Sequence, residues 1–258
     1  MSHRWVDVHT HLSSQEFDAD REEVLKRAYE VCEFLIDIGS GTSPDAFDRA
    51  CALADKNDRI YFTAGIHPHD AQKLGNQSDT LNKIERLLSH PKCVGVGECG
   101  LDYYYKHSDP EIQKEIFKWH IDLARRLNLP LMIHTRDAEE DTKALLSNFT
   151  GKAIFHCFTG TQDLANFGIS KNFMISFSGI VTFKNAEDLR KVFLNTPIEN
   201  ILIETDSPYL APVPMRGKRN ESSFVQYTGA FLADLKKMSS TEFSAATISN
   251  AKKTFGIT

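Results

Sequence analysis

The chain has 258 residues, of which 41% are hydrophobic and 25% are charged, and its formal net charge is −5. This composition is that of an ordinary soluble globular protein, and the length suffices for one large domain. Because the net charge is negative and no block of like charges occurs, a general nucleic-acid coat protein is excluded. Any nucleic-acid contact must therefore be local.

The cysteines and the hydropathy pattern indicate a reducing, aqueous location. The five cysteines are odd in number and form no CxxC pair, which argues against a disulfide framework and against a zinc knuckle. The first residues are polar, and no apolar run approaches the length of a membrane span. We expect a cytoplasmic protein without membrane contact; a monomer is compatible with the sequence, which does not fix the oligomeric state.

Eight short apolar runs, typical of buried strands, alternate with amphipathic helical stretches. The runs are 5–9, 34–39, 60–67, 93–98, 130–134, 153–158, 173–179 and 200–206. The clearest helix is predicted over 110–127, where apolar residues recur on one face and Ser108 or Asp109 supplies a cap before Pro110. Two more helical segments follow near 222–238 and 240–255.

This alternation predicts the fold class. Eight βα units within 258 residues fit a single (β/α)8 TIM barrel domain spanning 1–258, with an additional C-terminal helix. An open doubly wound sheet is the alternative that periodicity alone leaves open.

Residues that bind metals stand at the ends of most of the predicted strands. They are His9, His11, His67, Glu98, His134, His156 and Asp206. A single histidine in such a place is an ordinary polar residue, but the carboxyl ends of all barrel strands meet at one face. The side chains therefore converge, and the sequence predicts a metal site there.

The types of ligand suggest two ions. Leaving His67 aside, six imidazole and carboxylate groups exceed the four ligands of a structural zinc site, and no cysteine is suitably spaced. Glu98, from the middle of the strand order, is the natural bridge between two divalent ions, which could be Mg²⁺, Mn²⁺ or Zn²⁺. Such a centre performs metal-assisted hydrolysis.

A series of motifs carries a family resemblance. From residue 5 to residue 257 the chain contains, in order, "DVHTHL", "GIHPHD", "GVGECGLDYYY", "LPLMIHTRDA", "HCFTG", "ETDSPYLAPVPMRGKRNE" and "NAKKTFGI". Together they resemble the TatD family of metal-dependent deoxyribonucleases in the amidohydrolase superfamily. The resemblance implies a TIM barrel with two divalent metals, most often Mg²⁺, and a 3′ to 5′ exonuclease that acts on DNA, on single strands or at 3′ ends.

The same resemblance implies roles for individual residues. His9, His11 and Asp206 would bind one ion, His134 and His156 would bind the other, and Glu98 would bind both. Asp206 and Glu98 would be the catalytic residues, and Asp206 would orient or deprotonate the attacking water. His67 would reach the scissile phosphate, and Asp7 would orient a ligand histidine. The chain departs from the family pattern at Met215 and Ser222, which concerns substrate binding and not metal ligation.

Further substrate contacts are predicted from charge. Arg216, Lys218 and Arg219 form the cationic stretch after the eighth strand, and Arg136 follows His134; each is a candidate phosphate contact, although a charge run is usually a solvated loop. Tyr103 and Tyr104 could stack on a base or pack on the rim. Cys99 and Cys157 are expected to turn away from the site, and His120 belongs to an external helix.

Two other functions compete with a nuclease. A small-molecule amidohydrolase or lactonase would use the same barrel, but many such enzymes bridge their metals with a carbamylated lysine, whereas the fourth run ends in Glu98. A metal-binding scaffold without catalysis is disfavoured because every expected ligand is present.

Overall fold

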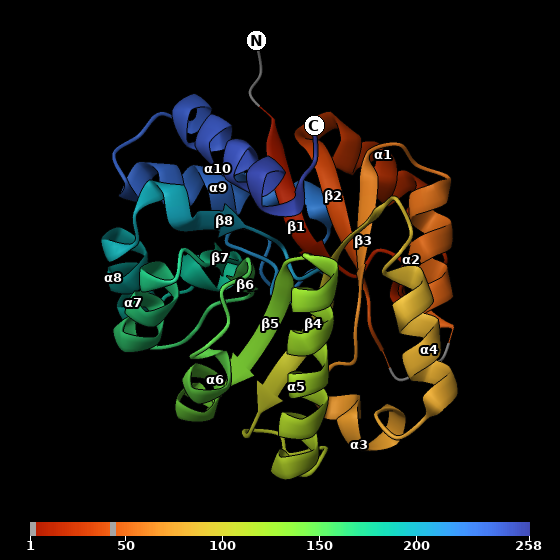
Figure 1. Cartoon of the computed structure of the whole chain (residues 1–258). Helices are drawn as coiled ribbons and strands as arrows, with labels where there is room; N and C mark the ends of the chain where they lie inside the picture. Colours follow the sequence, from red (N-terminus) through yellow and green to blue (C-terminus); the bar gives the residue numbers. More distant parts are fainter. Residues whose placement is uncertain (1–3, 42–44) are drawn as a thin grey trace.

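The computed structural model describes residues 4–41 and 45–258 and contains eight parallel strands in the order β1 to β8 (Figure 1). The strands are β1 (Trp5–Thr10), β2 (Cys32–Gly39), β3 (Ile60–Ala64), β4 (Cys93–Asp102), β5 (Leu131–Arg136), β6 (Ala153–Phe155), β7 (Met174–Phe177) and β8 (Ile201–Ile203). They form a nearly closed barrel, so the predicted fold class is confirmed. The strands are buried throughout most of their length, as parallel strands covered by helices must be.

Helices cover the outside of the barrel (Figure 1). They are α1 (Arg21–Val31), α2 (Ala46–Asp55), α3 (Ala71–Leu74), α4 (Ser78–Leu87), α5 (Pro110–Leu127), α6 (Glu139–Leu146), α7 (Gln162–Ser170), α8 (Glu187–Asn195), α9 (Val225–Leu235) and α10 (Ser240–Phe255). The additional C-terminal helix predicted from the sequence is α10, which begins with a capping box between Ser239 and Glu242.

Helix α5 shows why the sequence pattern was readable. Asp109 accepts a hydrogen bond from the backbone of Glu111 at 2.8 Å, which caps the helix directly before Pro110. Asn128 ends the helix in the left-handed conformation, with a φ of 54°. The apolar face between these ends packs on the barrel, so the periodicity reflects real burial.

The strand ends differ from the prediction in a way that matters for the site. Strands β3, β6 and β8 each end three residues earlier than the apolar runs suggested, so His67, His156 and Asp206 lie in the following loops. Strand β4 instead continues past Glu98 to Asp102. The runs overestimate the strands because residues just past the last ladder bond, such as Ile66 and Thr205, stay buried at the barrel mouth.

The barrel closes at a seam between its first and last strands. The Asp206 backbone N–H donates to the His9 carbonyl at 2.9 Å, and the His11 N–H donates to the Ser207 carbonyl at 2.8 Å. The Thr10 and Ser207 hydroxyls lie 2.6 Å apart, beside the hydroxyl of Ser222. These bonds hold the loop after β8 directly against the end of β1.

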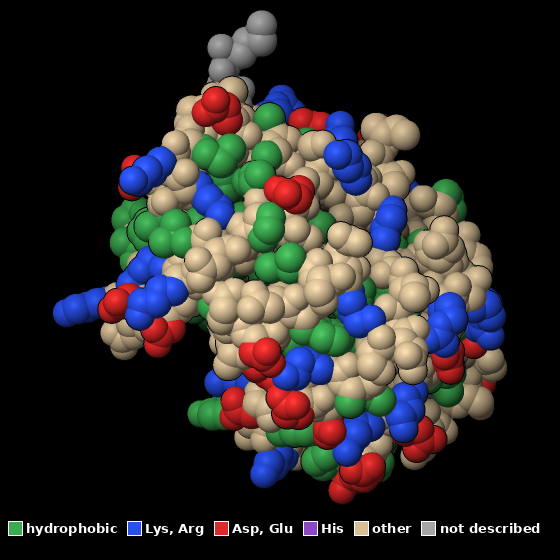
Figure 2. Space-filling model, turned by 60° about the vertical axis from the view of Figure 1, so that its left-hand side comes forward, with side chains coloured by type: hydrophobic (Ala, Val, Ile, Leu, Met, Phe, Trp, Pro, Cys, Tyr) green, Lys and Arg blue, Asp and Glu red, His purple; other side chains and the backbone are tan. Residues whose placement is uncertain are grey.

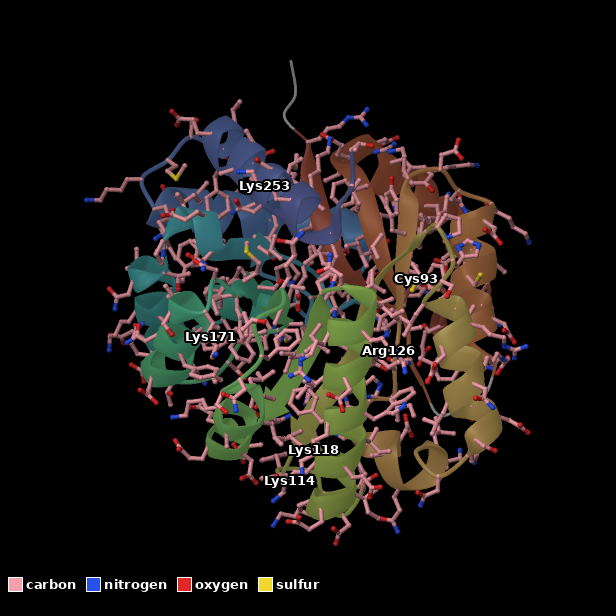
Figure 3. The ribbon with its side chains drawn as sticks, viewed as in Figure 1. Cys93, Lys114, Lys118, Arg126, Lys171 and Lys253 are labelled. Carbon is pink, nitrogen blue, oxygen red and sulfur yellow. The ribbon has the colours of Figure 1, made fainter. Side chains whose placement is uncertain are left out.

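The exterior carries mixed charges. Figure 2 shows Lys and Arg side chains interspersed with Asp and Glu on the face in view. Figure 3 marks cations on different outer elements, with Lys114, Lys118 and Arg126 on α5, Lys171 after α7 and Lys253 on α10. Among the described residues, no helix combines the length and the apolar character needed to cross a membrane.

Candidate metal centre

A cavity of about 1340 Å³ opens at the carboxyl ends of the strands. Five of the six predicted metal ligands line it, namely His11, Glu98, His134, His156 and Asp206. The sixth, His9, is fully buried beneath them. The structure therefore brings together all six residues that the sequence predicted to converge.

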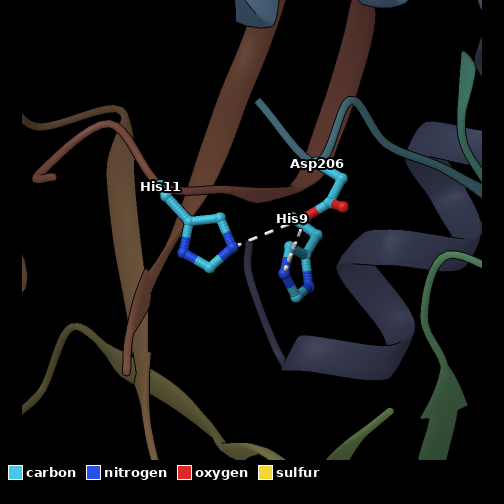
Figure 4. Close-up of side chains that lie close together, drawn as sticks. All are labelled: His9, His11 and Asp206. Atoms are coloured by element: carbon cyan, nitrogen blue, oxygen red, sulfur yellow. Dashed lines mark ion pairs between the residues drawn. The ribbon is translucent and has the colours of Figure 1, made fainter. Parts of the chain in front are cut away.

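One group of candidate ligands, referred to below as the first group, consists of His9 and His11 at the end of β1 and Asp206 in the loop after β8 (Figure 4). Asp206 Oδ1 lies 3.4 Å from His11 Nε2 and 3.6 Å from His9 Nε2. Burial acts to raise the pKa of Asp206, but the hydrogen bond from His11 and the nearby His9 and His156 rings together outweigh it and lower that pKa. Asp206 is therefore a carboxylate, the form that binds a cation.

Glu98 lies between this group and the remaining histidines. Its Oε2 is 3.5 Å from His9 Nε2, while its Oε1 is 2.8 Å from His156 Nε2 and 3.3 Å from His134 Nδ1. Burial acts to raise the pKa of Glu98, but His156 and His67 hold it well below its usual range. With one oxygen toward each side, Glu98 has the position that a bridging ligand needs.

The buried histidine nitrogens fit a cation. His9 is fully buried, and neither of its ring nitrogens has a hydrogen-bond partner among the described residues. Its ring stacks on that of His156 with centroids 3.8 Å apart and planes 10° apart, which aligns the edges of the two rings. An unpaired buried polar atom is costly, and a divalent ion bound to His9 Nε2, beside Glu98 and Asp206, would remove that cost at this nitrogen.

Two carboxylates behind the centre orient its histidines. Asp102 Oδ2 lies 3.1 Å from His134 Nε2, so that nitrogen carries the proton and Nδ1 offers its lone pair toward Glu98. Glu204 Oε1 lies 3.2 Å from His156 Nδ1, which leaves Nε2 of that ring facing inward. Burial acts to raise the pKa of Asp102, but the hydrogen bond from His134 and further donors hold it well below the ordinary value.

His67 is close to Glu98 but differs from the other histidines in its tautomer. Its Nδ1 accepts the backbone N–H of His69 at 3.1 Å, so the neutral ring carries its proton on Nε2, 3.2 Å from Glu98 Oε1. Burial lowers the pKa of His67 to about 4, which keeps the ring neutral. His67 therefore lines the cavity with its Nε2–H directed at the Glu98 carboxylate.

Asp7 does not orient a ligand ring, so that expectation is wrong. Its carboxylate accepts hydrogen bonds from the Thr205 N–H at 2.9 Å and from the Thr205 hydroxyl at 2.6 Å. Its hydrogen bond with His9 is to the backbone N–H and not to the ring. Asp7 instead fixes the residue directly before Asp206. Ring orientation is supplied by Asp102 and Glu204, two residues that no sequence motif marks as functional.

Of the cationic residues predicted to contact phosphate, one lines the cavity and the others lie away from it. Arg136 lines the cavity, with its guanidinium 3.9 Å from the centre of the Tyr104 ring. Arg219 is held by Asp20 at 2.5 Å and by the Glu16 carbonyl, and the Arg216 guanidinium covers the Phe183 ring. Neither these two nor Lys218 is among the residues that line the cavity within the described chain.

Several other expectations change. Cys99 is buried as expected, whereas Cys157, with a φ of 43°, is among the residues that line the cavity, and its Sγ lies 3.3 Å from the Ser178 hydroxyl. His120 lies on external helix α5, yet its ring is fully buried and accepts the N–H of Ile66 at 3.0 Å, which anchors the segment before His67. Tyr103 donates to Asp141 at 2.7 Å and so is tied to α6.

A further group that could hold a metal lies away from the cavity. Cys51 and Asp55 of α2 approach His90, whose Nε2 is 3.2 Å from the Asp55 carboxylate. His90 Nδ1 accepts the Lys92 N–H at 3.2 Å, so its Nε2 carries the proton and donates to Asp55. This arrangement is satisfied as a hydrogen bond without an ion.

Comparison with known proteins agrees with the class that this geometry defines, a metal-dependent hydrolase on a TIM barrel. A family model described as "TatD related DNase" matches residues 6–256. The chain is 42% identical over 255 residues to the uncharacterized metal-dependent hydrolase YabD of Bacillus subtilis (strain 168), covering 97% of this chain and 98% of YabD. The chain belongs to the TatD family.

Two further relatives extend the comparison. The "3'-5' ssDNA/RNA exonuclease TatD" of Erwinia tasmaniensis is 34% identical over 262 residues, covering 97% of this chain and 99% of that protein. The crystal structure of YJJV, a TatD homolog from Escherichia coli K12, superposes with a TM-score of 0.90 at 26% identity and covers all of both chains.

Proposed function

We propose that the protein is a Mg²⁺-dependent nuclease that removes nucleotides from the 3′ ends of single-stranded DNA. The observation that carries the proposal is Glu98, which stands between two groups of imidazole and carboxylate ligands at the floor of an open cavity. The name of the Erwinia tasmaniensis relative, an exonuclease on single-stranded DNA and RNA, supports the substrate class.

The proposed ligands divide around Glu98. His9, His11 and Asp206 would hold one divalent ion, and Glu98 would be shared with the second ion. His134, through Nδ1, and His156, through Nε2, would complete that second site. Bound there, the ions would activate a water molecule and stabilise the negative charge that develops on an attacked phosphate.

The chain's own residues supply the remaining functions. Asp206, whose side chain is 15% exposed and lines the cavity, is placed to accept a proton from the attacking water. His67 offers its Nε2–H to a phosphate oxygen. Arg136 is the cavity-lining cation of the predicted contacts and would bind a neighbouring phosphate, whereas Arg219 is already engaged by Asp20.

A small-molecule amidohydrolase is the weaker alternative. In many amidohydrolases the group that bridges the two metals is a carbamylated lysine, whereas here the residue between the two ligand groups is Glu98. The cavity, at about 1340 Å³, is also larger than the sites usual for small ligands. Glu98 at the shared position favours a phosphodiesterase, and the size of the cavity favours a segment of a polymer as the substrate.

The test is release of nucleotides from 3′-terminal single-stranded DNA with Mg²⁺. We expect Glu98→Ala and Asp206→Asn to reduce the rate by more than about 100-fold, since loss even of groups behind metal ligands costs about 10- to 100-fold. Glu187→Ala, at a side chain that is 77% exposed on α8, is the matched control and should retain activity. Unchanged release by both site variants would contradict the proposal.

A substrate panel separates the two functions. The wild type is incubated with single-stranded DNA, double-stranded DNA, RNA, and simple lactones and amides, with Mg²⁺, Mn²⁺, Zn²⁺ or a chelator. We expect hydrolysis of the nucleic acids and its loss with the chelator. Turnover of the lactone or amide alone would replace the nuclease by the amidohydrolase.

A further inference from the structure

Two exposed tyrosines stand at the rim of the cavity. Tyr105 is 51% exposed and Tyr209 is 55% exposed, and both line the cavity. Tyr105 follows β4 and Tyr209 follows β8, and strands four apart in an eight-stranded barrel lie on opposite sides. The metal centre therefore lies between two aromatic rings that keep apolar surface in contact with water.

The ring of Tyr105 is held in a preformed array. It stacks on His107 with centroids 5.7 Å apart and planes 7° apart, and it meets the edge of His69 at 5.4 Å. The Arg136 guanidinium lies 4.8 Å from its centre. His69 is fixed in turn by Asp102 at 2.8 Å, so the array is tied to the carboxylate that orients His134.

Tyr209 is tied to the opposite side of the centre. Its backbone N–H donates to the Asp206 carbonyl at 2.9 Å, and its own carbonyl accepts from Asn220 at 2.5 Å. Its ring meets that of His11 at 6.2 Å with an angle of 68°. The backbone is thus immobilised beside two metal-ligand candidates while much of the ring surface stays uncovered.

The surroundings favour a substrate that runs between these rings. A second cavity of about 550 Å³ adjoins the first at Thr135 and Arg136, but it is lined by Asp137, Glu139, Glu140 and Asp141. Lys143 pairs with Glu140 and Lys114 pairs with Asp141, but the four carboxylates still outnumber these cations and Arg136, and the remaining negative charge repels a phosphate backbone. A strand whose phosphate sits at the metal centre is therefore directed from Tyr105 toward Tyr209.

We propose that Tyr105, with His107, and Tyr209 form two base-stacking subsites that hold the unpaired bases on either side of the scissile phosphate. The inference rests on the proposed nuclease function and specifies its substrate as a single strand with flat bases at both positions. Stacking on an aromatic ring is tolerant of sequence because every base has a π-face. A duplex end would have to unpair before it could enter.

The test uses oligonucleotides in which one base at a time is missing. Wild type, Tyr105→Ala, Tyr209→Ala and the ring-retaining controls Tyr105→Phe and Tyr209→Phe are assayed with Mg²⁺. The substrates are a normal single strand and two strands that carry an abasic residue at the 3′-terminal or at the penultimate nucleotide. KM and kcat are measured for each pair.

We expect each abasic substitution to raise the wild-type KM about 10-fold. Each alanine variant should lose that sensitivity at one position only, with Tyr105 and Tyr209 corresponding to different positions, while the phenylalanine variants behave like the wild type. Equal losses of the alanine variants on all substrates, or no loss on any, would overturn the stacking subsites and leave the nuclease function standing. Failure of the wild type to cleave any of the strands would overturn both.

Discussion

The histidines of the centre are oriented by residues behind them. The Asp102 carboxylate accepts hydrogen bonds from His134 Nε2 at 3.1 Å and from His69 Nε2 at 2.8 Å, and it also accepts the backbone N–H groups of Tyr104 and Tyr105. With this acceptor in place, His134 keeps its Nδ1 lone pair free for an ion. Asp102 is therefore a positioning residue that acts through His134.

Replacing Asp102 by asparagine tests this role. The two rings bond to Oδ2 and the two backbone N–H groups bond to Oδ1. An amide has one acceptor oxygen and cannot serve both sets, so we expect the metal affinity to fall about 10- to 100-fold while high metal concentrations restore much of kcat. Metal titrations by calorimetry and by activity measure the two effects. Asp188→Asn, at a side chain that is 96% exposed, is the control. An unchanged metal affinity in Asp102→Asn would contradict the role.

Asp7 gives a prediction about pH. Burial raises the pKa of Asp7 from 3.8 to about 7 in the folded protein. The folded state thus holds this proton more tightly than the unfolded state, so the stabilising effect is complete below about pH 4 and is lost as pH rises through 7. Asp7→Asn, which resembles the protonated acid, removes this dependence.

The measurement is urea unfolding of metal-free wild type and Asp7→Asn at pH 5 and pH 8. We expect the stability of the wild type relative to the variant to decrease by roughly 2–3 kcal/mol between these pH values. A difference between the two proteins that does not change with pH would refute the raised pKa.

At the scale of single residues, the candidate metal ligands could be predicted from the sequence, but the residues that form hydrogen bonds with them could not. His134 and His156 were predictable because each follows an apolar run whose end must reach the barrel mouth. Asp102 and Glu204 were not, because strand alternation does not tell which ring a neighbouring carboxylate meets. The prediction of Arg219 as a cavity-lining phosphate contact failed because its guanidinium is bound by Asp20, 199 positions away in the sequence, and the run of charges does not reveal that partner.

Strands β3 and β4 approach each other unusually closely just before the site. A Cβ at Gly65 would lie 2.4 Å from the Cα of Gly97, so no side chain fits between these backbones. His67 follows two residues after Gly65, and Glu98 follows Gly97 directly. The close approach of the two glycines thus brings His67 within hydrogen-bond distance of Glu98.

We expect Gly65→Ala to force these strands apart. The variant should lose about 1–3 kcal/mol of stability to overpacking, and its metal affinity should fall because Glu98 moves with its strand. Gly217→Ala is the control, because a Cβ there meets nothing within 4 Å and only the φ of 84° is strained. The control should lose about 1 kcal/mol and retain metal binding; retention of metal affinity by Gly65→Ala would contradict the expectation.

At the scale of elements, the order and number of strands were predictable from alternating apolar runs, and α5 was predictable almost to the residue. The strand ends were not, because Ile66 and Thr205 are buried by the cavity floor although they lie beyond β3 and β8. Apolar character reports burial, and at a barrel mouth burial continues past the last ladder bond.

The whole molecule brings the ligands together through closure of the barrel. His9 and Asp206 are joined by a backbone hydrogen bond across the seam between β1 and β8, while Glu98 reaches the same point from β4 on the far side. No local segment contains the complete ligand set, so the centre exists only in the folded chain. Bound ions should consequently stabilise the native state.

The location of the ions tests the central claim most directly. Crystals soaked in Mn²⁺, as a substitute for Mg²⁺, are measured at the manganese absorption edge. We predict two anomalous peaks, one contacting His9, His11 and Asp206 and one contacting His134 and His156, with Glu98 touching both. A single peak, or peaks that leave Glu98 uncoordinated, would contradict the two-ion centre.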